Sequence, residues 1–372
     1  MKIIISPDSF KGTMTSGEVT SVIKTAIKKV DNNIETICLP IADGGEGTLD
    51  ALIKATKGRY LTAVVQNPLG KLIEAKYGVL GDEKTCVIEM AQASGLTLIQ
   101  EKEKTPRFAT TYGTGQLIQH AMDSGYRQFI IGIGGSATND GGQGMLRALG
   151  MKFIAKDGKK ILNDVFQFKE INKIDLSNFD SRISESAFMI ACDVENPLIG
   201  SNGATSVFGP QKGVVQHDIN RFDQNLNHYI SVVESQQNVE VRHRAGAGAA
   251  GGIGSAFMAF FPHQFKSGVD IVLEAVQFSK HLDHADFVIT GEGKSDEQTL
   301  SGKAPIGVAK LAKEQGVPTI LLSGMVENPI MLNQYFHYVE SIVGDEISAE
   351  QSLNNPIYYL EQKVTDLIKR LI

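Results

Sequence analysis

The stretch that decides the fold of this chain is FIIGIGGSATNDGGQGMLRAL, residues 129–149. It opens with an apolar run typical of a buried strand, Phe129–Ile131, and it ends with apolar residues at helical spacing, Met145, Leu146 and Leu149. Between them lie six glycines and four small polar residues. Glycines let backbone N–H groups approach an anion closely, and the start of a helix adds partial positive charge. The stretch predicts a strand, an anion-binding loop and a helix, while tight turns are the simpler use of any single glycine.

Both ends of the chain repeat this order of strand, loop and helix. Residues 2–6 and 34–42 predict strands, and the helix between them has a capping-box pattern at its start, Thr15 with Glu18. The same alternation returns from residue 285 towards the C-terminus. This order is typical of a parallel sheet covered by helices, in which ligand-binding loops follow the carboxyl ends of the strands.

Residues 59–90 interrupt the alternation with three successive strands joined by short turns. Such a meander indicates a second domain inserted into the first. We therefore predict an α/β fold in which residues 1–60 and 286–372 form one discontinuous domain. Residues 61–285, which carry the glycine-rich loops, form the inserted α/β domain.

Composition excludes several classes of protein. The chain has 372 residues, of which 42% are hydrophobic and 21% charged, as expected for a globular protein of about two domains. Its net charge of −6 leaves no basic field for nucleic acid, and its three scattered cysteines form neither a disulfide framework nor a CxxC metal site. The apolar start before Pro7 is too short for a signal peptide, and no apolar run is long enough to span a membrane. We therefore expect a cytoplasmic protein.

The chain contains no P-loop, HExxH or GxSxG motif. Two matches to the dinucleotide-binding pattern GxGxxG/A are present, GIGGSA at 132–137 and GAGAAG at 246–251. The second follows VRHRA, which is not a buried strand, and the first lacks a clear acidic strand end about 20 residues further on. Both matches are weak, and an NAD-dependent hydroxy-acid dehydrogenase that uses the first one stays an alternative.

The loops at predicted strand–helix junctions share one chemical character, namely carboxylates, amides and single lysines beside glycines. Carboxylates can hold Mg²⁺ or orient a hydroxyl group, and lysines with backbone N–H groups can hold phosphate or carboxylate. Taken singly, each is more readily a surface charge or a helix cap, so the argument rests on their recurrence. The ligand-binding candidates are Asp8, Lys11, Gly134, Gly135, Ser136, Asn139, Asp140, Asn196, Lys212, Gly246, Gly248, Gly291, Glu292 and Lys294.

Asp193 is the candidate for the base that takes a proton from a substrate hydroxyl group. It directly follows the apolar run 187–192, so its backbone should be fixed at the end of a strand. The residue before Pro197 disfavours helical angles, so no helix start is expected to stabilise the ionised carboxylate of Asp193. The simpler alternative is that Asp193 closes a turn with Asn196.

Two further residues, Asp43 and Lys303, are candidates for catalysis. Asp43 and Glu46 precede a predicted helix, where the ionised carboxylate is favoured and suits a magnesium or lysine partner. Asp43 and Asp296 are therefore the predicted ligands of a magnesium ion.

Ten strings at or near these loops follow one another along the chain: SPDSFKG (6–12), LPIADGGEGT (39–48), IEMAQASGL (88–96), TTYGTGQLI (110–118), IGIGGSATNDGGQGML (131–146), ACDVENPL (191–198), VFGPQKG (207–213), AGAGAAGGIG (245–254), VITGEGKSDEQT (288–299) and GKAPIGVA (302–309). With these strings the sequence resembles a known family, the bacterial glycerate kinases of the first type, which transfer phosphate from ATP to glycerate. The resemblance covers essentially the whole chain in family order, and such long strings have no general structural reason to occur together. One departure is Lys294, where the family commonly has arginine, so a bidentate anion contact is lost there.

The resemblance implies a Rossmann-like, three-layer domain with an unusual α/β domain inserted in it, and an active site in the cleft between the two. It implies ATP-dependent phosphorylation of D-glycerate assisted by Mg²⁺, with 2-phosphoglycerate as the favoured product. Three alternatives stay open: 3-phosphoglycerate as the product, the dehydrogenase, and a non-catalytic binding protein for small organic acids. A homodimer also stays open, whereas no nucleic acid or membrane partner is expected.

Overall fold

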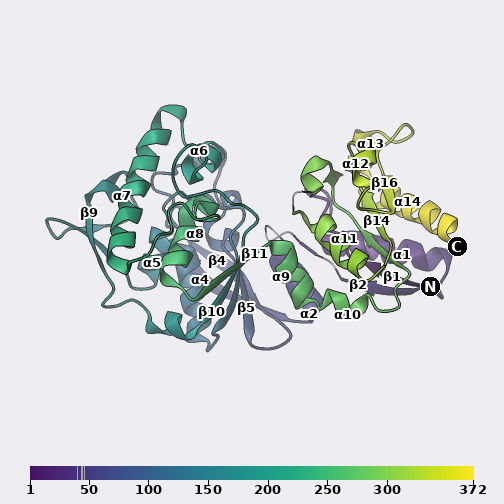
Figure 1. Ribbon diagram of the computed structural model, residues 1–372, viewed down its shortest axis with the longest axis horizontal. Coiled ribbons are helices and arrows are strands. Elements are labelled where there is room, and N and C mark those ends of the chain that lie inside the picture. The colour runs from purple at the N-terminus through teal and green to yellow at the C-terminus, as the bar shows by residue number, and fades with distance from the viewer. Residues whose placement is uncertain (40, 43–44, 46, 301) are drawn as a thin grey trace. The chain divides into compact units, whose positions relative to one another are not determined.

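The computed structural model of the protein describes residues 1–39, 41–42, 45, 47–300 and 302–372. The described chain divides into two compact units. Unit 1 comprises Met1–Lys57 and Ser267–Ile372, and unit 2 comprises Gly58–Lys266. Figure 1 shows both ends of the chain in unit 1, so unit 2 is an insertion in the sequence of unit 1.

The sheet of unit 1 has five strands that all pair in parallel. Across the sheet they are β16 (Tyr338–Ser341), β14 (Thr319–Ser323), β12 (Phe287–Thr290), β1 (Lys2–Ile5) and β2 (Glu35–Cys38). The chain passes from β1 to β2 on one side and then builds outward from β12 on the other. This is a doubly wound arrangement whose strand order reverses between β1 and β12.

Helices cover both faces of this sheet and give unit 1 three layers. On one face, α1 (Ser16–Val30) and α14 (Pro356–Leu371) share an apolar cluster with the strands. On the other face, α11 (Ala304–Glu314) and α12 (Pro329–Leu332) pack around Leu321. The remaining elements of unit 1 are α2 (Thr48–Thr56), α9 (Gly268–Ala275), α10 (Phe278–His281), α13 (Ala349–Asn354), β13 (Lys294–Ser295) and β15 (Met325–Val326).

The predicted capping box of α1 is confirmed. The Thr15 hydroxyl accepts a hydrogen bond from Glu18 N at 3.3 Å, and the Glu18 carboxylate accepts one from Thr15 N at 2.8 Å. These bonds satisfy two backbone donors at the start of the helix. The helix therefore begins where the sequence places it, directly after the loop that follows β1.

Unit 2 is built on a six-stranded sheet. Across it the strands are β11 (His263–Lys266), β10 (Ala187–Ala191), β6 (Gln128–Gly132), β5 (Thr85–Glu89), β4 (Leu72–Val79) and β3 (Arg59–Gln66). The first four pair in parallel, whereas β4 pairs antiparallel with both of its neighbours. The three successive strands expected in residues 59–90 are confirmed as β3, β4 and β5.

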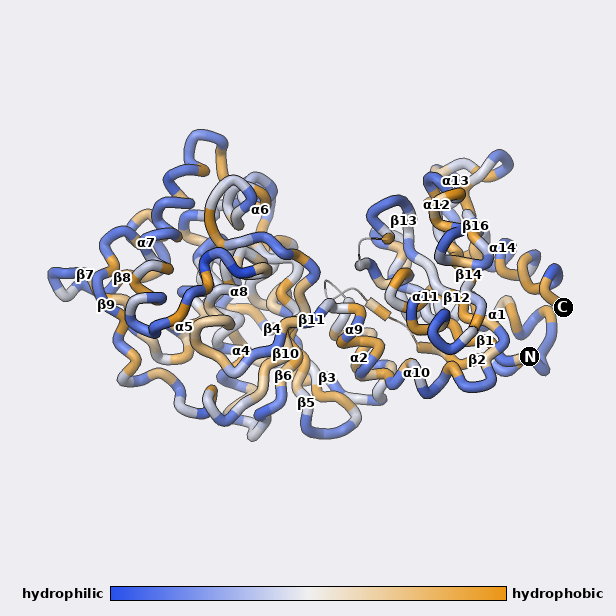
Figure 2. The backbone as a smooth tube through the Cα atoms, in the orientation of Figure 1, coloured by the Kyte–Doolittle hydropathy of each residue, from blue (hydrophilic) through white to orange (hydrophobic). Residues whose placement is uncertain are grey.

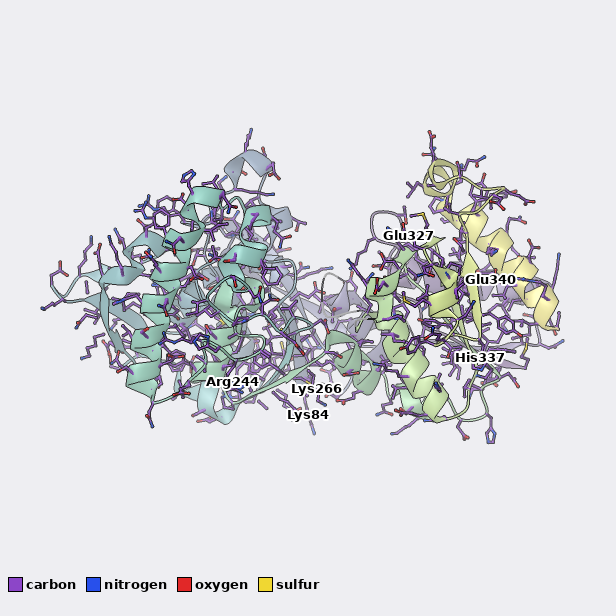
Figure 3. The ribbon with its side chains drawn as sticks, turned by 45° about the horizontal axis from the view of Figure 1, so that its top comes forward. Lys84, Arg244, Lys266, Glu327, His337 and Glu340 are labelled. Carbon is purple, nitrogen blue, oxygen red and sulfur yellow. The ribbon has the colours of Figure 1, made fainter. Side chains whose placement is uncertain are left out.

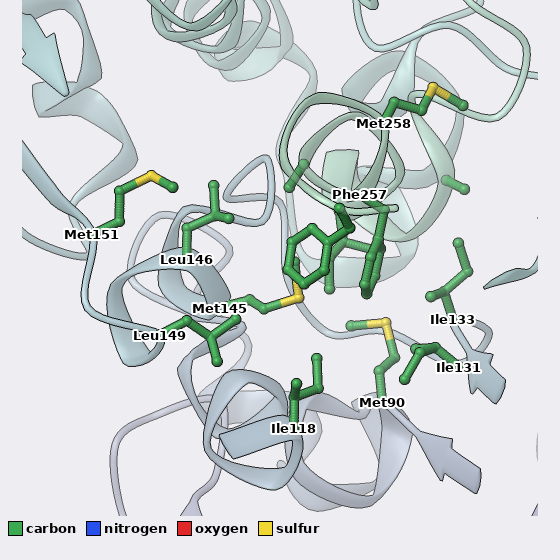
Figure 4. Packing of buried hydrophobic residues seen from close by; sticks show 14 of the residues in the cluster. Met90, Ile118, Ile131, Ile133, Met145, Leu146, Leu149, Met151, Phe257 and Met258 are labelled. Carbon is green, nitrogen blue, oxygen red and sulfur yellow. The ribbon is translucent and has the colours of Figure 1, made fainter. Parts of the chain in front are cut away.

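The stretch 129–149 also has the predicted order, because β6 leads through the glycine-rich loop to α5 (Gln143–Ala148). Figure 4 shows Met145 and Leu146 of this helix in the apolar cluster that includes Phe257. The other elements of unit 2 are α3 (Ala91–Ser94), α4 (Tyr112–Asp123), β7 (Lys152–Ala155), β8 (Lys160–Ile161), β9 (Ile171–Asp175), α6 (Ala204–Phe208), α7 (Ile219–Gln237) and α8 (Ala249–Phe260). In Figure 2 the turn between β7 and β8 is hydrophilic, while the central strands β6 and β10 are mainly hydrophobic.

Residues 267–285 differ from the domain boundary expected from the sequence. The expectation assigned them to the inserted domain, whereas the structure groups α9 and α10 with unit 1. Their packing gives the reason, because α9 contacts both α2 and α11. A Cβ atom at Gly307 of α11 would lie 2.8 Å from the side chain of Val269, so this contact is close. Among the described residues, no helix has the length and apolar character needed to cross a membrane.

Candidate functional site

The carboxyl ends of the unit 1 strands surround a cavity of about 350 Å³. Its walls come from the segments that follow β1, β12, β14 and β16, so it lies where the strand order reverses. Open α/β sheets bind their ligands at this position. Five candidates from the sequence line the cavity, namely Asp8, Lys11, Glu292, Lys294 and Lys303.

Backbone contacts hold the loops of the cavity together. Asp8 N donates to Gly291 O at 2.8 Å, which joins the segments after β1 and β12. Met325 N donates to the carbonyl of Gly293 at 3.0 Å, which joins the segments after β14 and β12. A Cβ atom at Gly291 would lie 1.7 Å from Leu322 O, so only glycine fits there. The structure thus explains Gly291 by close packing of two neighbouring strand ends.

Glu292 is a buried charged group in the wall of the cavity. It is 8% exposed, and its Oε1 accepts hydrogen bonds from Thr299 Oγ1 at 2.6 Å and Ser295 Oγ at 3.2 Å. Its Oε2 accepts from Lys303 Nζ at 3.2 Å. A buried carboxylate needs such partners, and these three fix its orientation. Glu292 therefore positions the ammonium group of Lys303.

Two lysines of the cavity flank Asp296. Lys303 Nζ and Lys294 Nζ each lie 3.9 Å from a carboxylate oxygen of Asp296. Lys294 Nζ also lies 2.9 Å from Glu327, which is labelled in Figure 3. The hydrogen bond from Lys294 to Glu327 raises the pKa of Lys294, so its side chain is cationic at neutral pH. The structure thus brings together predicted cationic and anionic groups from the loop after β12.

The predicted magnesium ligands are only partly described. Asp43, like its neighbour Glu46, lies outside the described residues, whereas Asp296 is half-buried beside the two lysines. In the described part of the chain, no group of three His, Cys, Asp or Glu side chains is arranged to hold a metal ion. The donor chemistry of this region fits a nucleotide with its cation, because Asp296 offers carboxylate oxygens and the lysines of the cavity offer charges for phosphate.

In unit 2 the glycine-rich loop after β6 encloses Asp140, which is 1% exposed. Its carboxylate accepts hydrogen bonds from the backbone N–H groups of Thr111, Gly142 and Gly144 at 2.8 to 3.1 Å, and from the Thr111 hydroxyl at 2.9 Å. Burial raises the pKa of Asp140, while these hydrogen bonds oppose the rise. The amide groups expected to hold an external anion therefore hold the chain's own carboxylate.

Other residues of this loop divide between surface and interior. Gly135 is exposed and Gly134 is half-buried, so both are accessible to a ligand. Asn139 is 0% exposed, and its side-chain amide donates to Thr205 Oγ1 at 2.8 Å. The structure does not support a direct ligand contact for Asn139 or Asp140, because no ligand can reach them without moving the loop.

Lys212 is a buried lysine that contacts the same loop. It is 2% exposed, and its Nζ donates to Ser136 Oγ and to Thr138 O, both at 2.7 Å. Burial lowers the pKa of Lys212 to about 7, although the nearby charge of Asp140 favours the ammonium form. Lys212 and Ser136, both expected to bind ligand, instead bind each other and hold the loop.

The second glycine cluster supports the same loop. Gly251 O accepts a hydrogen bond from Gly141 N at 2.9 Å, and a Cβ atom at Gly251 would lie 2.0 Å from Thr138 O. Gly248 N donates to Asn196 O at 2.9 Å, and Gly246 has a positive φ of 84°. The weak GxGxxG match is therefore a packing element of unit 2, since its backbone lies against neighbouring loops.

Asp193 lies two residues beyond the end of β10 and is exposed. This is the carboxyl end of the parallel part of the unit 2 sheet, as the sequence predicted. The neighbouring Asn196 uses its side-chain amide to donate to Asn202 O at 2.8 Å. Asp193 thus has the position expected of a base, and its role stays a prediction.

Sequence reasoning missed several side chains of these two regions. Glu89 ends β5 beside Gly132 of β6 and is 3% exposed, and Gln92 donates to it at 3.3 Å. In unit 1, Ser295 Oγ lies 2.7 Å from Ser323 Oγ, which connects Glu292 to the end of β14. Gly132 and Ser323 are distant in the sequence from the residues they contact, so local pattern does not reveal these contacts. The one available signal was the position of Glu89 at the end of an apolar run, where ligand-binding residues often lie.

Comparison with known proteins gives one consistent result. A family model described as the glycerate kinase family matches residues 3–372. A glycerate kinase from Bacillus subtilis is 44% identical over 370 residues, which cover 99% of this chain and 97% of that protein. A glycerate 2-kinase from Escherichia coli is 44% identical over 330 residues, which cover 89% of this chain and 87% of that protein.

A solved structure is similar as well. The crystal structure described as glycerate kinase 2 from Salmonella typhimurium LT2 has a TM-score of 0.90 and 40% sequence identity. The similarity covers 100% of this chain and 98% of the other. The similarity therefore includes both units.

Proposed function

This chain belongs to the glycerate kinase family, and on that premise we propose that it transfers the γ-phosphate of ATP to D-glycerate with the assistance of Mg²⁺. We propose 2-phosphoglycerate as the product. The observation that carries the proposal is 44% identity to a glycerate kinase over 99% of the chain. The lysine-lined cavity of unit 1 supports it, because a phosphoryl-transfer enzyme needs cations around the phosphates.

Phosphoryl transfer requires the protein to align the acceptor hydroxyl group with the γ-phosphate and to offset the negative charge that spreads over its oxygens. Lys303 is suited to the second task, because Glu292 fixes its ammonium group at 3.2 Å. Lys294 adds a second cation from the same loop. Asp296 and Asp43 are the residues that we propose would hold magnesium, which would supply positive charge to offset that of the phosphates.

The acceptor hydroxyl must lose a proton as its bond to phosphorus forms. We assign the proton to Asp193, whose exposed carboxylate at the end of β10 is accessible to a small substrate. Gly134 and Gly135 follow the neighbouring strand β6 and leave backbone open to solvent beside it. These groups are suited to the carboxylate of glycerate, since backbone N–H groups bind small anions well.

A coupled assay for ADP tests the proposal. Purified protein with ATP, Mg²⁺ and D-glycerate should release ADP, and omission of glycerate should abolish the release. NADH formation from NAD and glycerate, without ADP release, would identify a dehydrogenase instead. Binding of glycerate without consumption of either nucleotide would identify a binding protein.

Cellular location and assembly are further parts of the proposal. ATP is an intracellular nucleotide, so we propose a cytoplasmic enzyme whose partners are its small substrates. A homodimer is the assembly to test, by sedimentation of the purified protein. A mass equal to one chain at assay concentrations would show that the enzyme is a monomer.

A further inference from the structure

We infer that the unit 1 cavity binds the adenine nucleotide, with the base against its apolar wall and the phosphates against its lysines. The inference rests on the proposed kinase function and adds to it the place and orientation of the nucleotide. It is carried by the position of the cavity, by the two kinds of side chain in its lining, and by an accessible serine hydroxyl in its wall.

The position of the cavity favours a nucleotide. It lies beyond the carboxyl ends of β1 and β12, between which the order of the strands reverses. In doubly wound sheets this crevice is the place where mononucleotides and dinucleotides bind, because neighbouring loops separate there and leave space above the sheet. The volume of about 350 Å³ is within the range of small-molecule sites and is much larger than a three-carbon acid needs.

The lining of the cavity has two kinds of side chain. Lys11 and Lys294 follow the neighbouring strands β1 and β12, and Lys303 precedes α11. The apolar residues Ile342 and Val343 follow the edge strand β16, which β14 separates from β12, and Leu353 and Pro356 belong to α13 and the start of α14. Glycerate has an oxygen on each of its carbons and would leave this apolar wall bare, whereas a nucleotide has an apolar base face and a polyanionic tail.

Leu353 shows that part of the apolar wall is exposed to solvent. Its side chain is 63% exposed, although it lines the cavity. Together with Ile342, Val343 and Pro356, it gives the cavity an apolar lining of the kind that small-molecule sites have. A flat base placed on Leu353 would remove this side chain from water, which is favourable.

Ser352 supplies a polar group in the same wall. The residue is 8% exposed and lines the cavity, and its hydroxyl makes no hydrogen bond with any residue that the structure describes. The oxygen of this hydroxyl is accessible and not enclosed by protein, so it is available to the polar edge of a purine base. Leu353 and Ser352 together thus form a site for the base.

Direct binding measurements on two variants test the assignment. Leu353→Glu adds a carboxylate to the apolar wall and should raise the Kd for ADP and for adenosine about tenfold or more. Lys294→Met removes a cation from the lining and should weaken ADP binding while leaving adenosine binding nearly unchanged. Ile330→Glu is the matched control, because Ile330 is 80% exposed in the same unit and does not line the cavity.

The outcomes separate this inference from the proposed function. Leu353→Glu should raise KM for ATP in the ADP assay and leave KM for D-glycerate unchanged. A wild-type enzyme that turns over normally, with a Leu353→Glu variant that binds ADP as tightly as wild type, would overturn the inference and leave the kinase function intact. A rise in KM for glycerate alone would place the acid in this cavity and overturn it as well. Absence of glycerate-dependent ADP release by wild type would refute the function, and ADP binding that Leu353→Glu weakens would still uphold the nucleotide site.

Discussion

At the scale of single residues, Lys212 is unusual because its side chain is buried, whereas lysine side chains are usually exposed. A lysine ammonium group favours water, yet Lys212 is 2% exposed and its two hydrogen bonds hold the loop after β6. The sequence places Lys212 beside glycines and so predicts an anion site. It cannot show that the lysine's partners are Ser136 and a backbone carbonyl, because these lie more than seventy residues away along the chain.

Lys212 should make the stability of the protein depend on pH. Its pKa is about 7 in the folded protein and about 10.4 in an unfolded chain, so the unfolded chain holds more protons between these values. The free energy of unfolding should therefore rise with pH above about 7, by at most about 1.4 kcal/mol per pH unit from this group. Denaturant unfolding at pH 6.5 to 9 measures the effect.

The comparison for this measurement is Lys212→Met, which removes the titrating group and keeps Asp140. The raised pKa of Asp140 acts in the opposite direction, and it is present in both proteins. The difference in unfolding free energy between wild type and variant should change in favour of wild type as the pH rises. Parallel pH profiles for the two proteins would show that Lys212 does not titrate in this range.

Asp193 is the residue on which the proposed chemistry depends most. Its position after β10 was predicted from an apolar run followed by a Pro-containing segment, and the structure places it there. Asp193→Asn keeps the size of the side chain and removes the proton acceptor, so turnover should fall about 10²-fold or more, with KM for ATP nearly unchanged. A large increase in KM for ATP with normal turnover would instead make Asp193 a nucleotide or metal ligand.

At the scale of elements, the local sequence pattern predicted which strands and helices form, but not which groups bind one another. The order of β6, loop and α5, the capping box of α1 and the three strands of residues 59–90 follow from spacing and turn residues, which act locally. We predicted that the backbone N–H groups of the loop after β6 bind an external anion, but several of them bind the carboxylate of Asp140. A carboxylate within the loop can take those N–H groups itself, and spacing alone does not distinguish the two uses.

The start of α8 explains why the second glycine cluster is needed. Ala250, Gly251 and Gly252 have positive φ values of 52°, 71° and 95°, and Gly251 lies against the loop after β6. Gly251→Ala should destabilise unit 2 by about 3 kcal/mol or more, because a Cβ atom there would lie 2.0 Å from Thr138 O in addition to the strain of a positive φ. Thermal unfolding measures the loss.

Gly158→Ala is the matched control for this prediction. Gly158 also has a positive φ, of 87°, but nothing lies within 4 Å of the position where its Cβ would be. Its substitution should cost only the backbone strain, about 1 to 2 kcal/mol. Equal destabilisation by the two variants would contradict close packing at Gly251.

At the scale of the whole molecule, the alternation of strands and helices at both chain ends predicted a discontinuous α/β domain, and the meander indicated an insertion. The order of strands in unit 1 was not predicted, because pairing between β1 and β12 joins segments nearly three hundred residues apart. That order places the cavity between the loops after β1 and β12. The candidate residues of these loops meet there because of this long-range pairing, which the local sequence pattern does not reveal.

The central claim is that the γ-phosphate of ATP moves to the C2 hydroxyl of D-glycerate, and proton-coupled ³¹P NMR of the reaction tests it most directly. A phosphate ester on C2 couples to the single proton of that carbon and gives a doublet, whereas an ester on C3 couples to two protons and gives a triplet. We predict loss of the γ-phosphate signal of ATP with growth of a doublet, only when Mg²⁺ and D-glycerate are both present. A triplet would contradict the assigned product, and a spectrum with no new phosphate ester would contradict the kinase itself.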